Sequence, residues 1–323
     1  MAGWQRRRSL QCKVGVAEGK ALSLYSFPEP HIFNHFRAER FWAALREKGL
    51  PTEMVAPLSA GRGLLSLFHS EGHIRFVEQA SQRGTGFLDQ GDTPTFKGIM
   101  EAAQFAVGTT VSCADLVMKG ELDHAMNPVG GLHNATKEKS AGFCVLNDIG
   151  VAIEHLRKAY GVRRFLYVDI DVHHGDGVYY PYESDPAVAV FDVHEDGRYQ
   201  YPGTGSASEV GKGNAKGTKV NVPLLPGSGD KELIDALPRL EDLAMRTKPE
   251  FIIFQCGADG LRGDPIAGLQ YSRGAHKEVA KMLHRLAHDL CGGKLIALGG
   301  GGYVPENCAD AWTAVVEALL GPI

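Results

Sequence analysis

The sequence predicts an α/β fold, a single-domain open parallel sheet flanked by helices. Short β-rich runs alternate with longer helical patterns along the 323 residues. Several of the short runs are apolar throughout, which is typical of strands that are covered on both faces. No linker, repeat or low-complexity segment divides the chain, so we expect one domain over residues 1–323.

Each element is predicted from its residue pattern. Runs rich in apolar and β-branched residues predict, in chain order, strands at 13–16, 124–127, 164–169, 187–193, 219–222, 251–256 and 294–299. Apolar residues recurring at helical spacing predict helices at 34–48, 97–119, 148–160, 230–245, 273–290 and 305–320. In 97–119, for example, Ala103, Ala106, Val107 and Val111 recur at this spacing, and we expect that stripe to pack in the core.

Composition excludes several classes of protein. A chain with 44% hydrophobic and 22% charged residues is an ordinary globular protein, and a net charge of −4 offers no broad basic face for nucleic acid. Six cysteines without a CxxC pair indicate buried, reduced thiols in a cytoplasmic protein. Arg6, Arg7 and Arg8 precede no apolar stretch, and polar residues such as Asp115 interrupt the most apolar long segment. We therefore expect no signal peptide and no membrane span.

Chemistry is expected at the carboxyl ends of the strands, where ligands bind in open parallel sheets. Asp169, Asp171 and His173 follow one predicted strand at two-residue spacing, and Asp259 follows another. Burying this much charge calls for a compensating cation. Asp171, His173 and Asp259 offer one nitrogen and two carboxylates, and they leave a position open for water, as a catalytic zinc or iron(II) site requires. Each residue alone also fits a helix cap or a buried ion pair.

Two glycine-rich loops follow other strands. One covers residues 127–135 and contains His133, and the other contains four successive glycines at 299–302 before Tyr303. Such glycines let the backbone turn tightly and bring the Tyr303 hydroxyl beside a ligand. The alternative of a phosphate-binding loop is weak, because no Lys-Ser/Thr pair follows.

Five motifs together resemble the zinc-dependent histone deacetylase and acetoin-utilisation superfamily, whose members share the arginase/deacetylase α/β fold. These motifs are GFCVLND at 142–148, the segment 169–177, YPGTG at 201–205, GAD at 257–259 with GDP at 263–265, and GGGY at 300–303. The resemblance extends over nearly the whole chain. It implies that Asp171, His173 and Asp259 bind zinc, with iron(II) as an alternative, and that Tyr303 hydrogen-bonds the acyl carbonyl.

The resemblance also implies a substrate channel. Phe143 and Tyr201 correspond to the two walls of a narrow acyl-lysine channel, with Ile266 near its rim, and the family usually has phenylalanine where this chain has Tyr201. Asp92 corresponds to the rim aspartate that holds the substrate backbone. Gly142 and Gly301 complete the predicted substrate-binding residues. A potassium-type cation site is implied near Asp169 and Asp192, with His194 beside it.

One position departs from the family pattern. The family normally has two adjacent histidines, each backed by an aspartate, whereas here His133 is followed by Asn134. His133 keeps its expected partner Asp169, but Asp176 is left facing an amide, which takes up no proton near neutral pH. Because the second histidine is described in the family as general base and proton shuttle, the resemblance implies a weakened or inactivated enzyme. We favour a substitution introduced to trap a ligand over a long-degenerate pseudoenzyme, because the other site residues are retained.

Three functional classes follow. The leading one is a zinc-dependent deacylase acting on acyl-lysine in proteins or peptides, or on an acetylpolyamine or another small amide. An arginase-type ureohydrolase needs a second metal, and its ligands are missing because Gly175 and Gly257 occupy those positions. The third is an inactive acyl-lysine binder. No nucleic-acid or membrane partner is expected, and the oligomeric state is not predicted. The remaining histidines are expected on the surface or hydrogen-bonded in the core: His31, His35, His69, His73, His124, His155, His276, His284 and His288.

Overall fold

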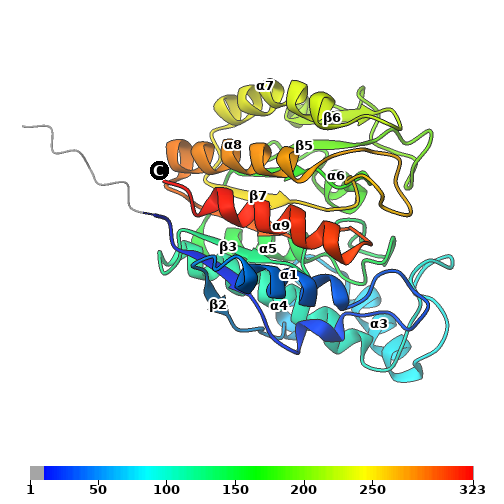
Figure 1. Cartoon of the computed structure of the whole chain (residues 1–323). Coiled ribbons are helices and arrows are strands. Elements are labelled where there is room, and N and C mark those ends of the chain that lie inside the picture. The colour runs from blue at the N-terminus through cyan, green and yellow to red at the C-terminus, as the bar shows by residue number, and fades with distance from the viewer. Residues whose placement is uncertain (1–10, 323) are drawn as a thin grey trace, which may run out of the picture.

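The computed structural model describes residues 11–322 and is built on an eight-stranded sheet (Figure 1). The strand order is β2-β1-β3-β8-β7-β4-β5-β6, and every neighbouring pair is parallel. The predicted α/β fold class is therefore confirmed. Arg6, Arg7 and Arg8 lie outside the described residues.

The strands agree with the predicted runs to within one or two residues, with one addition. They are β1 (Val14–Ala17), β2 (Glu53–Val55), β3 (His124–Asn127), β4 (Phe165–Asp169), β5 (Val188–Glu195), β6 (Lys219–Leu224), β7 (Phe251–Gln255) and β8 (Leu295–Leu298). The sequence pattern missed β2, a three-residue edge strand in which Glu53 and Met54 are exposed. An edge strand needs no continuous apolar run, because only part of it is covered.

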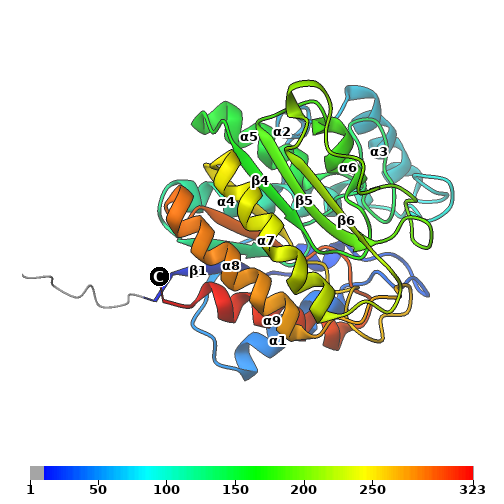
Figure 2. The same ribbon diagram turned by 90° about the horizontal axis from the view of Figure 1, so that it is seen from above.

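The helices form two layers, one on each face of the sheet (Figure 2). One layer contains α1 (Phe36–Glu47), α7 (Asp230–Thr247), α8 (Arg273–Cys291) and α9 (Pro305–Leu319), and the other contains α4 (Ile99–Met118) and α5 (Asp148–Tyr160). The remaining helices are α3 (Glu71–Arg83) and the one-turn helices α2 (Arg62–Leu65) and α6 (Asp176–Tyr179). The 3-10 turns are η1 (Leu22–Leu24), η2 (Tyr180–Tyr182) and η3 (Gly213–Ala215).

Helix α3 was not predicted, although its sequence carries both end markers. The Ser70 side chain accepts a hydrogen bond from the His73 backbone N–H at its start, and Gly84 ends it in the left-handed conformation. These are a typical N-cap and C-terminal glycine. Among the described residues, no helix is both long and apolar enough to cross a bilayer.

The core explains why the strand runs are so apolar. Every residue of β1, β3, β4, β5, β7 and β8 is buried, because helices cover both faces of the sheet. All six cysteines are buried and unpaired, as predicted. Because the strands are parallel, the carboxyl ends of β3, β4, β7 and β8 lie at the same end of the sheet. The last residues of these strands are Asn127, Asp169, Gln255 and Leu298.

Candidate active site

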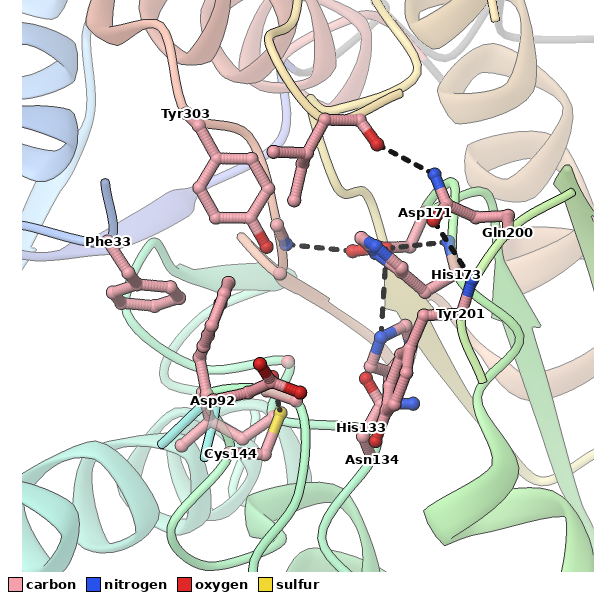
Figure 3. A pocket seen from close by; sticks show the side chains of 17 residues that line it. Phe33, Asp92, His133, Asn134, Cys144, Asp171, His173, Gln200, Tyr201 and Tyr303 are labelled. Atoms are coloured by element: carbon pink, nitrogen blue, oxygen red, sulfur yellow. Dashed lines mark hydrogen bonds and ion pairs between the residues drawn. The ribbon is translucent and has the colours of Figure 1, made fainter. Parts of the chain in front are cut away.

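A pocket of about 190 Å³ opens at this carboxyl edge of the sheet (Figure 3). Eleven of the fourteen predicted site residues line it: Asp92, His133, Asn134, Gly142, Phe143, Asp171, His173, Tyr201, Ile266, Gly301 and Tyr303. The other three, Asp169, Asp176 and Asp259, each contact a residue that lines the pocket. The structure therefore brings the whole predicted set together from loops that follow different strands.

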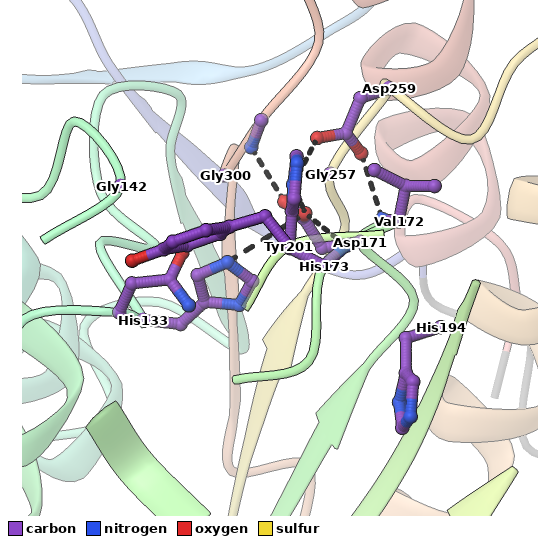
Figure 4. A network of polar contacts seen from close by, with 12 residues as sticks. His133, Gly142, Asp171, Val172, His173, His194, Tyr201, Gly257, Asp259 and Gly300 are labelled. Carbon is purple, nitrogen blue, oxygen red and sulfur yellow. Dashed lines mark hydrogen bonds and ion pairs between the residues drawn. The ribbon is translucent and has the colours of Figure 1, made fainter. Parts of the chain in front are cut away.

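Three potential metal ligands converge at the floor of the pocket (Figure 4). His173 Nδ1 lies 3.0 Å from Asp171 Oδ1 and 3.2 Å from Asp259 Oδ2. Ligands that bind a tetrahedral zinc at about 2.0–2.1 Å are separated from one another by about 3.3 Å, so both distances from His173 fit a shared divalent ion. The ligand atoms of His133, Asp171 and His173 also lie within 4.8 Å of one another. Asp259 Oδ2 is buried and accepts no hydrogen bond within the described part of the chain. A cation would satisfy this oxygen.

The ligand side chains are held by a second set of contacts. Asp171 Oδ2 accepts hydrogen bonds of 2.7 Å from Gln255 Nε2 and from the Gly301 backbone N–H. The Val172 backbone N–H donates to Asp259 Oδ1 at 3.0 Å. A Cβ atom on Gly301 would lie 1.9 Å from Asp259 Oδ2, so this loop approaches the carboxylates more closely than any side chain would allow. One oxygen of each carboxylate is therefore held by these hydrogen bonds, while the other oxygen faces His173.

The electrostatics of the floor also favour a bound cation. Burial raises the pKa of Asp259, and the neighbouring Asp171 carboxylate raises it further, to about 7. Burial alone would lower the pKa of His173, but the Asp171 and Asp259 carboxylates beside it raise it to about 10. The two carboxylates thus favour a positive charge between them. This is the local response to a buried excess of negative charge.

His133 is oriented by the carboxylate that the sequence assigned to it. Its Nδ1–H donates to Asp169 Oδ2 at 2.8 Å, and the Tyr167 hydroxyl donates to the same oxygen. Its Nε2 lies 3.6 Å from Asp171 Oδ1 and faces the pocket floor. Burial would lower the pKa of His133, but Asp171 and Asp169 raise it to about 10. His133 is therefore an ionisable group held at the floor of the pocket.

Asn134 is bonded in a way that fixes both of its N–H groups. Its Nδ2 donates to Asp176 Oδ1 at 2.8 Å and to the His174 backbone carbonyl at 3.0 Å. The side-chain carbonyl is left on the side of Gly142, because a Cβ on Gly142 would lie 2.8 Å from Asn134 Oδ1. Asn134 thus presents only a hydrogen-bond acceptor to the pocket, and Asp176 serves to hold the amide in this orientation.

The pocket walls are aromatic and rigidly held. Phe143 has a left-handed backbone (φ 65°), its N–H donates to Thr93 Oγ1 at 3.0 Å, and its carbonyl accepts from the Tyr25 hydroxyl at 2.8 Å. Its ring meets that of Tyr303 edge-on at a centroid distance of 5.8 Å. Figure 3 shows the Tyr303 hydroxyl turned toward the cluster that contains Asp171 and His173. Tyr201, on the opposite wall, lies 6.1 Å from the His173 ring between centroids.

The rim of the pocket is exposed. Asp92 lies in a loop that Asp89 organises, because Asp89 Oδ1 accepts from the backbone N–H groups of Gly91, Asp92 and Thr93. Ile266 is about one-third exposed at 36%, and its carbonyl accepts a 2.8 Å hydrogen bond from Gln200 Nε2. Both predicted rim residues are therefore available to a molecule that enters from solvent.

Several residues that support the site were missed. Gln255 at the end of β7 holds Asp171, and the buried Arg37 of α1 donates to the Gly300 carbonyl while its guanidinium lies 4.0 Å from the centre of the Phe33 ring. Phe33 itself lines the pocket. Gln255 directly precedes the predicted strand end and was open to the same strand-end argument, whereas Arg37 and Phe33 carry no local pattern that links them to a loop some 260 residues away.

The predicted monovalent-cation position is occupied by internal hydrogen bonds. Asp192 Oδ1 accepts from His194 Nδ1 at 2.6 Å, and Asp192 Oδ2 accepts from the Gly175 backbone N–H at 2.9 Å. His194 is fully buried and its Nε2 contacts the Gly205 carbonyl at 2.9 Å. Figure 4 shows His194 set apart from the floor of the pocket. A potassium-type site beside Asp169 and Asp192 stays a prediction.

Comparison with known proteins gives a consistent result. The model of the histone deacetylase domain matches residues 31–319. Acetoin utilization protein AcuC of Bacillus subtilis (strain 168) is 38% identical over 304 residues, which cover 91% of this chain and 77% of that protein. AcuC of Staphylococcus xylosus is 29% identical, covering 97% of this chain and 84% of that one.

A solved structure is similar over the same extent. The crystal structure of the HDA15 HD domain aligns with a TM-score of 0.88 at 29% identity, covering 96% of this chain and 89% of that one. The family match spans the pocket residues from Asp92 to Tyr303 and all strands of the sheet except β1. This chain therefore belongs to the histone deacetylase domain family.

Proposed function

We propose that this protein is a metal-dependent hydrolase that removes acetyl-type acyl groups from the side-chain amine of lysine in proteins or peptides. One catalytic domain over residues 1–323 would carry the reaction. The observation that carries the proposal is the convergence of Asp171, His173 and Asp259 beneath an aromatic-walled pocket. The family and the AcuC relatives support acyl-removing chemistry. The buried, unpaired cysteines support a reducing, cytoplasmic location.

Asp171, His173 and Asp259 are proposed to hold the metal, zinc or alternatively iron(II). When bound, such an ion polarises the acyl carbonyl and lowers the pKa of water. Gln255 and Gly301 keep Asp171 in place through its second oxygen. Hydrogen-bonded supports of this kind orient the ligands and tune their basicity.

Tyr303 and His133 are proposed to act on the reacting amide. Burial, together with Asp259 and Asp171, raises the pKa of Tyr303 well above its usual value, so its hydroxyl keeps its proton. It donates a hydrogen bond to the acyl oxygen, where negative charge develops in the transition state. His133, held by Asp169, is positioned to move a proton at its Nε2. Asn134 accepts a hydrogen bond only, so the leaving amine receives no proton from that side.

The substrate stem is proposed to lie between Phe143 and Tyr201. Four methylenes are slender enough for such a slot, and flat aromatic walls bury them well. Asp92 on the rim would accept hydrogen bonds from the backbone of an acylated peptide, and Ile266 would contact its apolar atoms. Asp92 is exposed at the rim, where its carboxylate is available to the backbone N–H groups of an acylated peptide.

The experiment is the Asn134→His substitution. An imidazole at this position can accept a proton and return it to the amine, and Asp176 is already in place to orient it. We expect kcat/KM on an acetyl-lysine peptide to rise by at least about 10²-fold, as general acid–base groups contribute. The two forms are compared at equal metal content, on the peptide and on an acetylated polyamine.

A matched control separates proton transfer from a change of shape. Asp176→Asn in the Asn134→His background keeps the imidazole but removes the charge that orients it, so most of the gain should disappear. Faster turnover of the polyamine than of the peptide would replace the proposed substrate with a small amide. Tight peptide binding without turnover in either form would identify the protein as an acyl-lysine binder and refute the catalytic proposal.

A further inference from the structure

A second group of potential metal ligands lies at the other end of the sheet. Cys12, His124, His284 and His288, the amino-end cluster, offer one ligand atom each within 4.8 Å of one another. His124 is the first residue of β3 and pairs in register with Val14 of β1, two residues after Cys12. The pocket instead lies beyond the last residue of β3. The cluster and the pocket are thus at opposite ends of one strand.

No sequence motif indicates this cluster, because its members are far apart in the chain. His284 and His288 are one helical turn apart on α8, and therefore share a face of that helix. His124 is 160 residues from His284, and Cys12 is 276 residues from His288. The prediction that these histidines are ordinary surface or core residues is open to revision on this geometry.

Three of the six separations between the ligand atoms are close contacts, and they match a tetrahedral metal site. His288 Nε2 lies 3.5 Å from Cys12 Sγ and 3.3 Å from His124 Nε2, and His124 Nε2 lies 3.0 Å from His284 Nδ1. Zinc bonds of about 2.05 Å to nitrogen and about 2.3 Å to sulfur place nitrogens about 3.3 Å apart and nitrogen and sulfur about 3.6 Å apart. The observed separations lie within about 0.3 Å of these values.

Hydrogen bonding alone explains the cluster poorly. A ring nitrogen carries either one proton or one lone pair, both directed along a single line in the ring plane. If the Cys12 thiol donates to His288 Nε2, a single proton on His124 Nε2 must be shared between His288 and His284. A metal ion removes this conflict, because all four atoms then direct lone pairs at one central point.

Burial favours a closed site with four protein ligands. Cys12, His124 and His284 are buried, and His288 is half-buried. One thiolate and three imidazoles are borderline-to-soft ligands, which select zinc over magnesium or calcium.

We propose that Cys12, His124, His284 and His288 bind a structural zinc ion that ties the N-terminal segment and β3 to helix α8. A surface pocket of about 410 Å³ reaches His284 and His288 and provides a path for the ion. Gln11 and Pro322 form a β-bridge, and Figure 1 shows the C-terminal end beside the start of the described chain. The ion would therefore stabilise the region where the two ends of the described chain, Gln11 and Pro322, lie side by side.

Cobalt(II) is the probe that distinguishes this site from the pocket. The pocket ligands Asp171, His173 and Asp259 contain no sulfur, so a thiolate-to-cobalt charge-transfer band in the near ultraviolet reports the amino-end cluster alone. We expect wild-type protein loaded with cobalt to show this band, and one equivalent of zinc bound at the cluster to abolish it. Cys12→Ser should eliminate the band, and His288→Ala should reduce cobalt affinity at least tenfold.

Two controls test the assignment. Cys291→Ser removes a buried cysteine at the end of α8 that is outside the cluster. Asp259→Asn weakens the pocket site. Both variants should keep the band. Circular dichroism checks that Cys12→Ser is folded. If it is not, the cobalt affinity of His288→Ala, which is altered at a half-buried position, tests the site independently. A folded wild type that binds cobalt without the band would overturn the proposal, and so would a band that persists in folded Cys12→Ser.

Discussion

At the residue scale, the chemistry open to the pocket depends on which donor and acceptor atoms are not already used in hydrogen bonds. His133 and Asn134 are neighbours in the chain, and each is backed by an aspartate. In His133 the bond to Asp169 leaves Nε2 free to exchange a proton. In Asn134 the bonds to Asp176 and to the His174 carbonyl use both N–H groups and leave an oxygen that cannot be protonated near neutral pH. The same backing arrangement thus gives an ionisable imidazole at one position and a fixed hydrogen-bond acceptor at the next.

Gly142 allows a residue-scale prediction about the channel. A Cβ there would lie 2.8 Å from Asn134 Oδ1 and 3.0 Å from Tyr201 Cε1, so Gly142→Ala should distort the channel wall. We expect the affinity for a hydroxamate with a lysine-like stem to fall about tenfold, as overpacking costs about 1–3 kcal/mol. Titration calorimetry at equal metal content measures this change.

The matched control for Gly142 is Gly161→Ala. Gly161 has the same left-handed backbone (φ 69° against 53°), but no atom lies within 4 Å of its added Cβ. It reproduces the backbone strain without touching the pocket. Unchanged hydroxamate affinity in Gly142→Ala, or an equal loss in both variants, would contradict the channel assignment.

At the element scale, three helices of one layer are joined through a single carboxylate. Glu317 of α9 lies 3.3 Å from Lys48 Nζ at the end of α1, and 3.0 and 2.8 Å from the side chains of Arg273 and Lys277 on α8. Only 21% of the Glu317 side chain is exposed. Such a network is worth more than an isolated surface pair, because each charge has several partners in fixed positions.

This network predicts a pH-dependent loss of stability. Partial burial would raise the pKa of Glu317, but Lys277, Arg273 and Lys48 lower it to about 2. Because the folded-state pKa is lowered, the stabilisation is present above the unfolded-state pKa and disappears as pH falls toward about 2. With allowance for solvent screening, Glu317→Gln should reduce the free energy of unfolding by about 1–2 kcal/mol at pH 7. The difference should fall by about half at pH 3.

Urea unfolding of both forms from pH 7 to pH 3 provides the measurement. Glu278→Gln is the control, because within residues 11–322 Glu278 forms an ion pair with Lys281 alone, on the exposed face of α8. An exposed pair three residues apart contributes about 0.2–0.5 kcal/mol. A Glu317→Gln effect no larger than that of Glu278→Gln, or one independent of pH, would show that the network does not stabilise the helical layer.

At the scale of the whole molecule, the sheet grades from a fully covered centre to an open edge. Strands β8, β7 and β4 lie in the middle of the order and are buried at every residue, whereas β2 lies at the edge with two of its three residues exposed. The pocket is built mainly on loops that leave the central strands. The three proposed metal ligands therefore follow β4 and β7, the strands that we expect to open least.

Hydrogen exchange should follow this gradient. Backbone amides of β7 and β4 need near-global unfolding to exchange, while those of β2 open locally. We expect exchange in β2 to be at least about 10³-fold faster than in β7, measured by mass spectrometry on peptides that cover each strand. Comparable protection of the two strands would mean that the β2 edge is covered in solution by something outside the described chain.

Sequence patterns alone predict the fold class, seven of the eight strands, six of the helices and most of the pocket residues. They do so because strands buried on both faces leave unbroken apolar runs, and because Asp171 and His173 lie in one short segment after such a strand. Asp259 and Tyr303 follow other strands, and parallel pairing brings those ends together.

Contacts between residues far apart in the chain depend on how the elements pack, and they are seen only in the tertiary structure. Helical spacing shows that His284 and His288 share a face, but only the packing of α8 against the start of β3 shows that this face meets His124 and Cys12. In the same way, Gln255 reaches Asp171 and Arg37 reaches Gly300 across 84 and 263 residues. Local patterns record which side of an element is buried, whereas the identity of the atoms on the other side is fixed only when the elements pack.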